Sequence, residues 1–348
     1  MAFTSDGLHV AIAGATGAVG QEFLQILTQR AFPVASLRLM ASARSAGSTI
    51  PWTDAAHDTH ELVVEDLASA DFTGVDVAFF SAGSEQAAQA RRAAAEGALV
   101  VDNSSAFRMD PDVPLVVPEV NAEAGRAHRG IIANPNCSTI ILVVVLAPLL
   151  RHVGIRRVVL STYQAVSGSG AAALAELDAQ ADAERAGRPL EADIYPAPIH
   201  GNVIPFVQAF GADDITTEEW KMVRETRRIL EAPELPVSAT CVRVPVRRAH
   251  SEAVNIEFDR VVSPDEVRAW LADAPGVQVI DEPATLAFPT PRDAQDGDDV
   301  LVGRIRHDPG HPQAIDLWLT GDQLRKGAAL NAVQIAEAVL CGATPEGS

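Results

Sequence analysis

One cysteine lies where a polar turn, Asn134-Pro135-Asn136, meets an apolar stretch that runs from Ile140 to Leu150. The unpaired N–H groups at a helix start stabilise negative charge, so a cysteine there loses its proton more readily than a free thiol does. The thiolate is the nucleophilic form of cysteine. Cys137 is therefore the candidate nucleophile, and the alternative is a small buried apolar residue.

A second candidate site is the glycine-rich loop Gly14-Ala15-Thr16-Gly17-Ala18-Val19-Gly20, which follows a strand-like segment and opens a helix-like one. Small residues there let a pyrophosphate approach the backbone N–H groups of the helix start. The spacing is G-x-x-G-x-x-G rather than the commoner G-x-G-x-x-G, and a structural turn is the alternative.

The end of the second predicted strand distinguishes between nicotinamide cofactors. An NAD site places a carboxylate there for the ribose hydroxyls, whereas this chain reads Ala41-Ser42-Ala43-Arg44-Ser45-Ala46-Gly47. A guanidinium pairs well with phosphate oxygens, so Arg44 with Ser45 suits the 2′-phosphate of NADP. We expect NADP as the cofactor, the alternative being an arginine in a solvated loop.

A nicotinamide site together with an activated thiol indicates aldehyde chemistry. Thiolate addition gives a thiohemiacetal, hydride transfer leaves a thioester, and a second nucleophile releases the acyl group. Such a mechanism needs a base, and the chain has nine histidines. His250 is the best candidate, because it opens the strand-like segment 249–259, where a polar side chain can face a cleft. No metal is expected.

The segments that must position these residues divide into two patterns. The first 134 residues alternate strand-like and helix-like runs, which is typical of a doubly wound parallel sheet. Strands are predicted at residues 8–13, 36–41, 75–80, 98–102, 115–117 and 130–133. We expect a Rossmann-like cofactor domain over residues 1–134, completed by a C-terminal helix within residues 322–348.

Residues 135–321 predict a second, mixed α/β domain with longer strands. The strands are expected at residues 157–163, 240–246, 253–259 and 314–319, and helices at 171–185 and 218–230.

Composition narrows the class of protein. The 348 residues carry a net charge of -19, which argues against a nucleic acid or an acidic membrane as partner. The cysteines (Cys137, Cys241 and Cys341) are odd in number and lack metal-ligand spacing, which favours a reducing compartment. With no signal-peptide pattern, and an apolar run too short to span a bilayer, we expect a cytoplasmic protein.

Motifs spread in order over nearly the whole chain make it similar to the aspartate-semialdehyde dehydrogenases. They are Gly14 to Gly20, Ser42 to Gly47, Ser81-Ala82-Gly83, Asp102 to Arg108, Asn134 to Thr139, Tyr163 to Gly170, Arg243-Val244-Pro245-Val246 and Gly327 to Asn331.

The resemblance implies NADPH-dependent reductive dephosphorylation of L-aspartyl 4-phosphate to L-aspartate 4-semialdehyde, a reversible step of lysine, diaminopimelate, threonine and methionine biosynthesis. Inorganic phosphate is then a co-substrate. The second domain becomes a catalytic and dimerisation domain, and the protein a homo-oligomer, either a dimer or a tetramer.

The resemblance also implies roles for single residues. Cys137 matches the acyl-thioester nucleophile, and His250 matches the acid/base that protonates the developing alkoxide. Gln164 matches the residue that orients the substrate, and Arg243 the arginine that clamps its carboxylate. The acid that meets the substrate amino group matches Glu218, although the adjacent glutamate, Glu219, leaves the register open by one residue.

Arg108 and Lys221 match the pair that binds inorganic phosphate or the acyl phosphate. Cofactor contacts are implied at Thr16, Gly17, Ala18, Val19, Arg44, Ser45, Ser167, Gly168 and Gln323.

Three other interpretations fit the sequence less well. N-acetyl-γ-glutamyl-phosphate reductase performs the same chemistry, but it usually has glycine before the cysteine, where this chain has Asn136. Glyceraldehyde-phosphate dehydrogenase would show a Ser-Cys-Thr-Thr-Asn run, which is absent. A non-catalytic relative acting as a binding protein would not be expected to keep Cys137, Gln164, Arg243 and His250 together.

Overall fold

The structure is a computed structural model that describes residues 7–341, without the side chains of Ala212 and Cys341. The described chain forms two compact units, residues 7–136 with 328–341, and residues 137–327. We expected the division at residues 134 and 321. Residues 322–327, which directly follow the last strand of the second sheet, belong to the second unit.

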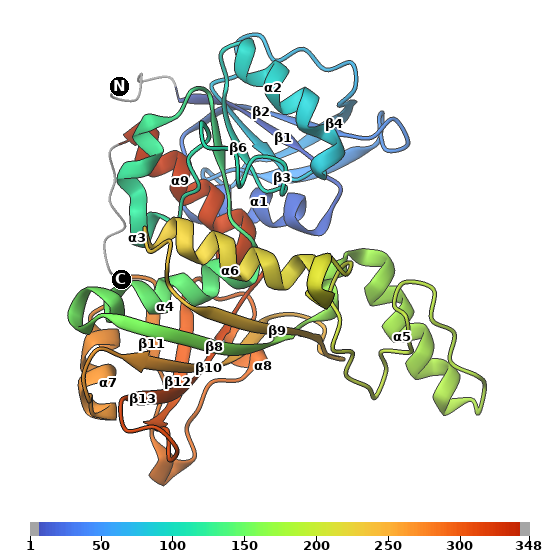
Figure 1. The fold of residues 1–348 in the computed structure, drawn as a ribbon. Helices are drawn as coiled ribbons and strands as arrows, with labels where there is room; N and C mark the ends of the chain where they lie inside the picture. The colour runs from blue at the N-terminus through green and yellow to red at the C-terminus, as the bar shows by residue number, and fades with distance from the viewer. Residues whose placement is uncertain (1–6, 342–348) are drawn as a thin grey trace. The chain divides into compact units, whose positions relative to one another are not determined.

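The first unit is built on a seven-stranded sheet in the order β3-β4-β2-β1-β5-β6-β7 (Figure 1). Neighbouring strands are parallel except for the β3–β4 hairpin at one edge. The strands are β1 (Leu8–Ala13), β2 (Val34–Ala41), β3 (Thr49–Thr53), β4 (Thr59–Asp66), β5 (Val77–Phe80), β6 (Leu99–Asp102) and β7 (Ile131–Ala133).

The order of the strands reverses at β1, where the chain runs first to β2 and later returns to β5. In open α/β sheets the ligand binds outside the carboxyl ends of the strands at such a switch point. The glycine-rich loop leaves β1 at this position and leads into α1 (Ala18–Gln29). The other helices of this unit are α2 (Ala87–Ala95), α3 (Pro118–Asn121) and α9 (Leu330–Cys341).

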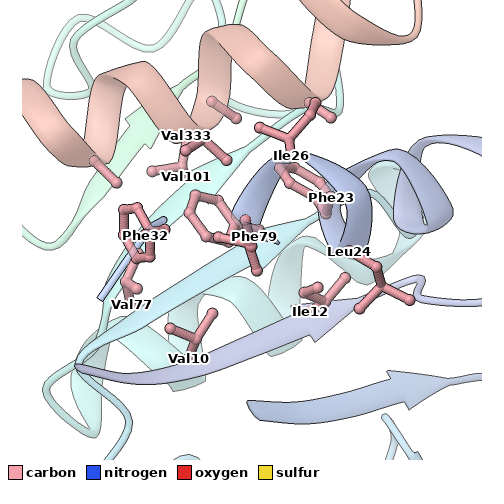
Figure 2. Packing of buried hydrophobic residues seen from close by; sticks show 14 of the residues in the cluster. Val10, Ile12, Phe23, Leu24, Ile26, Phe32, Val77, Phe79, Val101 and Val333 are labelled. Atoms are coloured by element: carbon pink, nitrogen blue, oxygen red, sulfur yellow. The ribbon is translucent and has the colours of Figure 1, made fainter. Parts of the chain in front are cut away.

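Apolar side chains from the sheet, α1 and α9 form the core of the first unit (Figure 2). Phe23 of α1 stacks on Phe79 of β5 with ring centroids 4.8 Å apart, and Phe32 meets the edge of Phe79. Val333 of α9 belongs to the same buried cluster. Burial of this apolar surface fixes α1 on the sheet, and the start of α1 is what a nucleotide would meet.

The second unit contains a mixed six-stranded sheet in the order β11-β12-β13-β10-β8-β9. Its strands are β8 (Ile155–Gln164), β9 (Val237–Arg243), β10 (His250–Phe258), β11 (Val277–Val279), β12 (Val300–His307) and β13 (Ala314–Gly321). Its main helices are α4 (Cys137–Val153), α5 (Ala171–Arg185), α6 (Thr217–Ile229) and α7 (Pro264–Ala272), with the short α8 (Pro291–Ala294).

The helix α4 is apolar on nearly all sides and packs on the sheet, with α6 and α7 as the neighbouring helices. Alternate residues of β10 point to this covered face, from His250 through Val254 to Phe258, and are buried. The opposite face carries Tyr163 and Trp318, whose rings lie 5.2 Å apart. A buried helix thus anchors this sheet from its covered face.

The fold class is confirmed, with a largely parallel first sheet and a mixed second one. Several elements differ from the prediction. The hairpin β3–β4 and the elements α7, β11 and β12 were not predicted, and residues 115–117 contribute only an isolated bridge from Leu115 to Ala133. Within residues 7–341, no helix combines the length and the apolar composition that crossing a membrane requires.

Candidate active site

Three of the predicted site residues lie at one end of the second sheet. Gln164 ends β8 and Arg243 ends β9, and the parallel register places the two residues side by side. His250 begins the antiparallel strand β10 and therefore lies at the same end. This end of the sheet gathers side chains that are distant in sequence.

Cys137 is the first residue of α4 and is half-buried. The helix cannot extend back through the preceding turn, because Asn134 lies before Pro135 and a residue before proline is biased toward extended conformations. The N–H groups at the start of α4 favour an anionic sulfur. Gly327 packs against Cys137: a Cβ on Gly327 would lie 2.9 Å from the Cβ of Cys137. Gly327 follows the end of β13 by a few residues, so the nucleophile adjoins the same end of the sheet.

His250 is fully buried. The backbone N–H of Ala165 donates to Nδ1 of the ring over 3.0 Å, and Nε2 has no hydrogen-bond partner among the described residues. Burial, and after it the positive charge of Arg243, lower the pKa of His250 well below its usual value. The ring is therefore neutral at physiological pH.

The backbone before His250 is constrained. Ala249 has φ 70, a left-handed conformation that is uncommon for a residue with a Cβ. Its N–H donates to Oε1 of Gln323 over 2.8 Å, and Nε2 of Gln323 donates to the hydroxyl of Ser167 over 2.5 Å. Gln323 and Ser167, both expected as cofactor contacts, thus also hold the segment that aims His250.

Arg243 is 5% exposed, and its Nη1 donates to the carbonyl oxygen of Ala165 over 2.6 Å. A Cβ on Gly168 would lie 3.0 Å from this nitrogen and 3.3 Å from Nε2 of His250. A side chain at Gly168 would therefore crowd both groups. A guanidinium in this position can bind a carboxylate.

Gln164, Glu218 and Lys221 form a hydrogen-bonded row. Nε2 of Gln164 donates to Oε1 of Glu218 over 3.1 Å, and Nζ of Lys221 lies 3.0 Å from Oε2 of Glu218. Glu218 is 2% exposed, so these contacts lie in the interior of the second unit. Lys221 also donates to the side-chain oxygen of Gln208 over 2.7 Å.

The neighbouring Glu219 has different contacts. Its carboxylate accepts from the backbone N–H groups of Thr216 and Cys241, over 2.8 and 3.0 Å, and it completes the capping box of α6. Glu219 therefore stabilises the start of the helix, whereas Glu218 faces Gln164. The geometry favours Glu218 over Glu219 as the acid that meets a substrate.

In the first unit, the glycine-rich loop has the shape of a phosphate cradle. Gly14 has φ 92, and a Cβ on Gly20 would lie 2.3 Å from the carbonyl oxygen of Gly14, so the loop closes this tightly only with glycine. Thr16 and Gly17 are exposed, and α1 has neither a capping side chain nor an acidic residue in its first turn. The free N–H groups of this helix start fit a pyrophosphate.

Arg44 and Ser45 lie in the turn that follows β2, at the carboxyl edge of the first sheet. The side chain of Arg44 is exposed and makes no ion pair or hydrogen bond among the described residues. An unpaired guanidinium at this edge suits a phosphate.

Arg108 belongs to the first unit and is 7% exposed. Its guanidinium donates to the backbone carbonyl groups of Asn134 and Asn103, over 3.0 and 2.6 Å. Lys221, its expected partner in phosphate binding, belongs to the second unit.

Sequence reasoning assigned no role to Ala165, Ala249 and Gly327. Each acts through its backbone: Ala165 bonds to both His250 and Arg243, Ala249 turns the chain into β10, and Gly327 packs on Cys137. Only the glycine could have been suspected, because it follows a strand end.

Two family models match the chain. The model of the semialdehyde dehydrogenase NAD binding domain matches residues 9–128, and that of the semialdehyde dehydrogenase dimerisation domain matches residues 146–326. An aspartate-semialdehyde dehydrogenase of Synechocystis sp. is 49% identical over 331 residues, which cover 95% of this chain and 96% of that protein. The chain belongs to the aspartate-semialdehyde dehydrogenase family.

Solved structures of aspartate-semialdehyde dehydrogenases agree. The Vibrio cholerae enzyme II, complexed with ASA, is 44% identical with a TM-score of 0.92, covering 97% of this chain and 99% of that one. The Candida albicans enzyme, solved with NADP, is 27% identical with a TM-score of 0.72, covering 96% and 98%. The resemblance inferred from the motifs is confirmed, and the chain is an oxidoreductase with a nicotinamide-nucleotide-binding domain.

Proposed function

We propose that this chain catalyses the reversible, NADPH-dependent conversion of L-aspartyl 4-phosphate to L-aspartate 4-semialdehyde and inorganic phosphate, through a thioester on Cys137. The observation that carries the proposal is the convergence of Gln164, Arg243 and His250 at the end of the sheet that adjoins the nucleophile. A relative that was solved with ASA bound supports the same substrate.

The proposed substrate site matches the charges of an amino acid. Arg243 pairs with the α-carboxylate, since a guanidinium can form two parallel hydrogen bonds to it. Glu218 accepts from the α-ammonium group, and Gln164, already bonded to Glu218 over 3.1 Å, orients the acyl group beside the thiol. A ligand that lacks either charge forgoes one of these charge-assisted hydrogen bonds, which is a basis for selectivity.

The proposed cofactor is NADP. Thr16, Gly17, Ala18 and Val19 hold the pyrophosphate at the start of α1, and Arg44 with Ser45 holds the 2′-phosphate. Ser167, Gly168 and Gln323 are the proposed contacts from the second unit. Gln323 uses one N–H and one lone pair for the protein, so it keeps one of each for a ligand.

Phosphate, the other proposed ligand, is an anion, and it must bind to a protein that itself has a net charge of -19. We assign it to Arg108 and Lys221. Both carry fixed positive charge, and local cations are required because the overall field repels anions. The dimerisation-domain match also supports a homo-oligomer, either a dimer or a tetramer.

The proposed reaction begins with attack of the Cys137 thiolate on the acyl carbon of aspartyl phosphate. The C–S bond forms, the C–O bond to phosphate breaks, and the electron pair leaves with phosphate. When bound, the nicotinamide supplies the hydride that reduces the resulting thioester. His250 acts on the substrate oxygen, where negative charge develops, and a donor in that position lowers the barrier.

Purified protein should reduce NADP with L-aspartate 4-semialdehyde only when phosphate is present. The same assay with N-acetyl-glutamate 5-semialdehyde is the control for the related reductase, whose substrate lacks the ammonium group that Glu218 would meet. A preference for the acetylated substrate, or turnover independent of phosphate, would overturn the proposal.

A further inference from the structure

The side-chain amide of Gln164 is held at both of its ends. Its Nε2 donates to Oε1 of Glu218 over 3.1 Å, and its Oε1 accepts from the hydroxyl of Thr162 over 3.1 Å. Gln164 is 1% exposed and Thr162 is fully buried. The oxygen and nitrogen ends of an amide have nearly the same shape, so the hydrogen-bond partners decide how the amide of Gln164 is oriented.

The hydroxyl of Thr162 has one proton, and its bond to the backbone does not compete for that proton. The N–H of Val242 donates to Oγ1 of Thr162 over 3.3 Å. A backbone N–H can only donate, so this bond occupies a lone pair of the hydroxyl and leaves the proton for Gln164. The amide therefore presents its oxygen to Thr162.

Two further polar side chains face Thr162 across the sheet. The strand register places Cys241 of β9 and Glu252 of β10 beside it. The thiol of Cys241 lies within hydrogen-bonding reach of the hydroxyl, and burial raises the pKa of this thiol, so the thiol keeps a proton of its own. Neither carboxyl oxygen of Glu252 has a hydrogen-bond partner among the described residues. The proton of Thr162 is therefore directed to Gln164.

The other end of the amide requires the same orientation. Glu218 forms an ion pair with Lys221, and a carboxylate can accept hydrogen bonds but cannot donate them. Turning the amide end for end would set the oxygen of Gln164 against a carboxylate oxygen of Glu218. That arrangement loses a buried hydrogen bond and adds repulsion.

Thr162 lies too deep in the sheet to be part of the substrate site itself. It precedes Gln164 by two residues on β8, so both side chains point to the covered face. Gln164 pairs with Arg243 at the end of the sheet, whereas Thr162 pairs with Cys241, two residues further inside. Thr162 can therefore act on a ligand only through Gln164.

We propose that Thr162 is a positioning residue of the candidate active site, and that its hydroxyl fixes the amide of Gln164 with the nitrogen toward Glu218. The proposal rests on the proposed function, in which Gln164 orients the acyl group beside the thiol. The hydroxyl of Thr162 contributes no atom to the reaction. It restricts the amide to one orientation before the substrate binds, and a loss of such orientation lowers the rate of the chemical steps.

Steady-state kinetics of the full-length protein test the proposal. Thr162→Val keeps the shape of the side chain but removes the donor, so kcat for L-aspartate 4-semialdehyde should fall roughly 10-fold with little change in KM. Thr162→Ser keeps a hydroxyl and should recover most of this loss. A Ser variant as slow as the Val variant would overturn the proposal.

Thr226→Val is the matched control. Thr226 of α6 is also fully buried, and its hydroxyl has no hydrogen-bond partner among the described residues. The substitution makes the same chemical change away from the amide, so kcat should stay at the wild-type value. An equal loss of kcat in Thr226→Val and Thr162→Val would show a general effect of removing a buried hydroxyl, and would overturn the proposal.

A double-mutant cycle separates positioning from a merely structural role. If Thr162 acts through Gln164, then Thr162→Val should change kcat by less than about 2-fold in a Gln164→Ala background. An undiminished loss in that background would show that Thr162 acts independently of the amide, and would overturn the proposal.

The orientation of the amide can also be tested without substrate. In protein labelled with ¹⁵N in its glutamine side chains, the signals of Gln164 are those absent from Gln164→Ala. We expect these N–H protons to exchange with solvent at least ~10-fold faster in Thr162→Val than in the wild type, because one of the bonds that hold the amide is lost. Equal exchange rates would overturn the proposal. Wild-type protein that does not turn over aspartate semialdehyde refutes the proposed function but leaves this measurement intact, so the two proposals fail separately.

Discussion

Glu218 and Glu219 are adjacent in sequence, yet their side chains have different partners. Successive residues of a helix point in different directions, so Glu218 faces Gln164 and Lys221, while Glu219 turns back to cap α6. The sequence left this choice open. The hydrogen bonds separate a carboxylate that is placed for a ligand from one that stabilises the helix.

The two glutamates should respond differently to substitution. Glu218→Gln removes the charge that we propose meets the substrate ammonium group, so the KM for aspartate semialdehyde should rise by roughly 10-fold or more. Glu219→Ala removes the capping box and should lower the free energy of unfolding by about 1 kcal/mol with little change in KM. Steady-state kinetics and denaturant titration measure the two effects. A reversed pattern would exchange the assigned roles.

Cys137 and Cys241 are two thiols in different surroundings, so substitution of Cys241 is the control for substitution of Cys137. Cys137→Ala should abolish turnover, because no thioester can form, and should leave NADP affinity nearly unchanged. Cys241 is fully buried on β9, and burial raises the pKa of its thiol, so it stays protonated and unreactive. Cys241→Ala should therefore remain active. Normal turnover by Cys137→Ala, measured beside cofactor titration, would refute the thioester mechanism.

Arg44 carries the proposed choice of cofactor. Arg44→Glu replaces a phosphate partner by a carboxylate, so the binding free energy of NADP should weaken by about 2 kcal/mol or more. NAD has no 2′-phosphate and serves as the internal control, because its Kd should change much less. Calorimetric titration with both cofactors measures the difference, and equal losses would show that Arg44 is only a loop charge.

At the scale of elements, the positions of the candidate site residues depend on where strands end. Residues 157–163 and 253–259 were predicted as strands and lie within or close to β8 and β10. Their register could not be predicted, because β8 has a parallel neighbour in β9 and an antiparallel one in β10. Register decides that Gln164, Arg243 and His250 meet at one end.

The activity should also be sensitive to substitution in the segment after β13. A Cβ on Gly327 would meet the Cβ of Cys137 at 2.9 Å, so Gly327→Ala should displace the thiol. A displacement of about 1 Å can cost on the order of 10²-fold in rate, and we expect a loss in kcat of that order. Gly310→Ala is the matched control, since the added Cβ would meet only a carboxylate oxygen of Asp308 at 3.3 Å. Equal activity of the two variants would contradict the packing argument.

At the scale of the whole molecule, one buried group works against stability. Glu252 lies on the covered face of β10, is fully buried, and neither of its carboxylate oxygens has a hydrogen-bond partner among the described residues. Burial raises the pKa of Glu252 well above the ordinary value of 4.5. The folded protein therefore keeps a proton that the unfolded chain releases.

This difference predicts how stability changes with pH. Above pH 4.5 the unfolded chain ionises at Glu252 while the folded protein does not, so each further pH unit costs about 1.4 kcal/mol until the folded pKa is reached. Glu252→Gln should match the wild type near pH 4 and exceed its Tm increasingly as pH rises toward 8. Thermal melts across this range test the prediction, and a constant difference between the two proteins would contradict it.

The sequence alone determined the family, through motifs spread along the chain, and the fold class. Local patterns suffice to predict the candidate site: a cysteine after an Asn-Pro-Asn turn, a glycine loop between a strand and a helix, and an arginine in place of a carboxylate after the second strand. Each depends on residues within a few positions of one another, and their physical chemistry is set by backbone geometry and charge.

The tertiary structure decided how the site is held together. Ala165 and His250 are 85 residues apart in sequence, and Ala249 and Gln323 are 74 apart. The backbone that aims the histidine and the glycine against Cys137 both depend on the tertiary fold. No local pattern encodes these contacts, because a backbone N–H or a missing Cβ acquires a role only when folding brings another group against it.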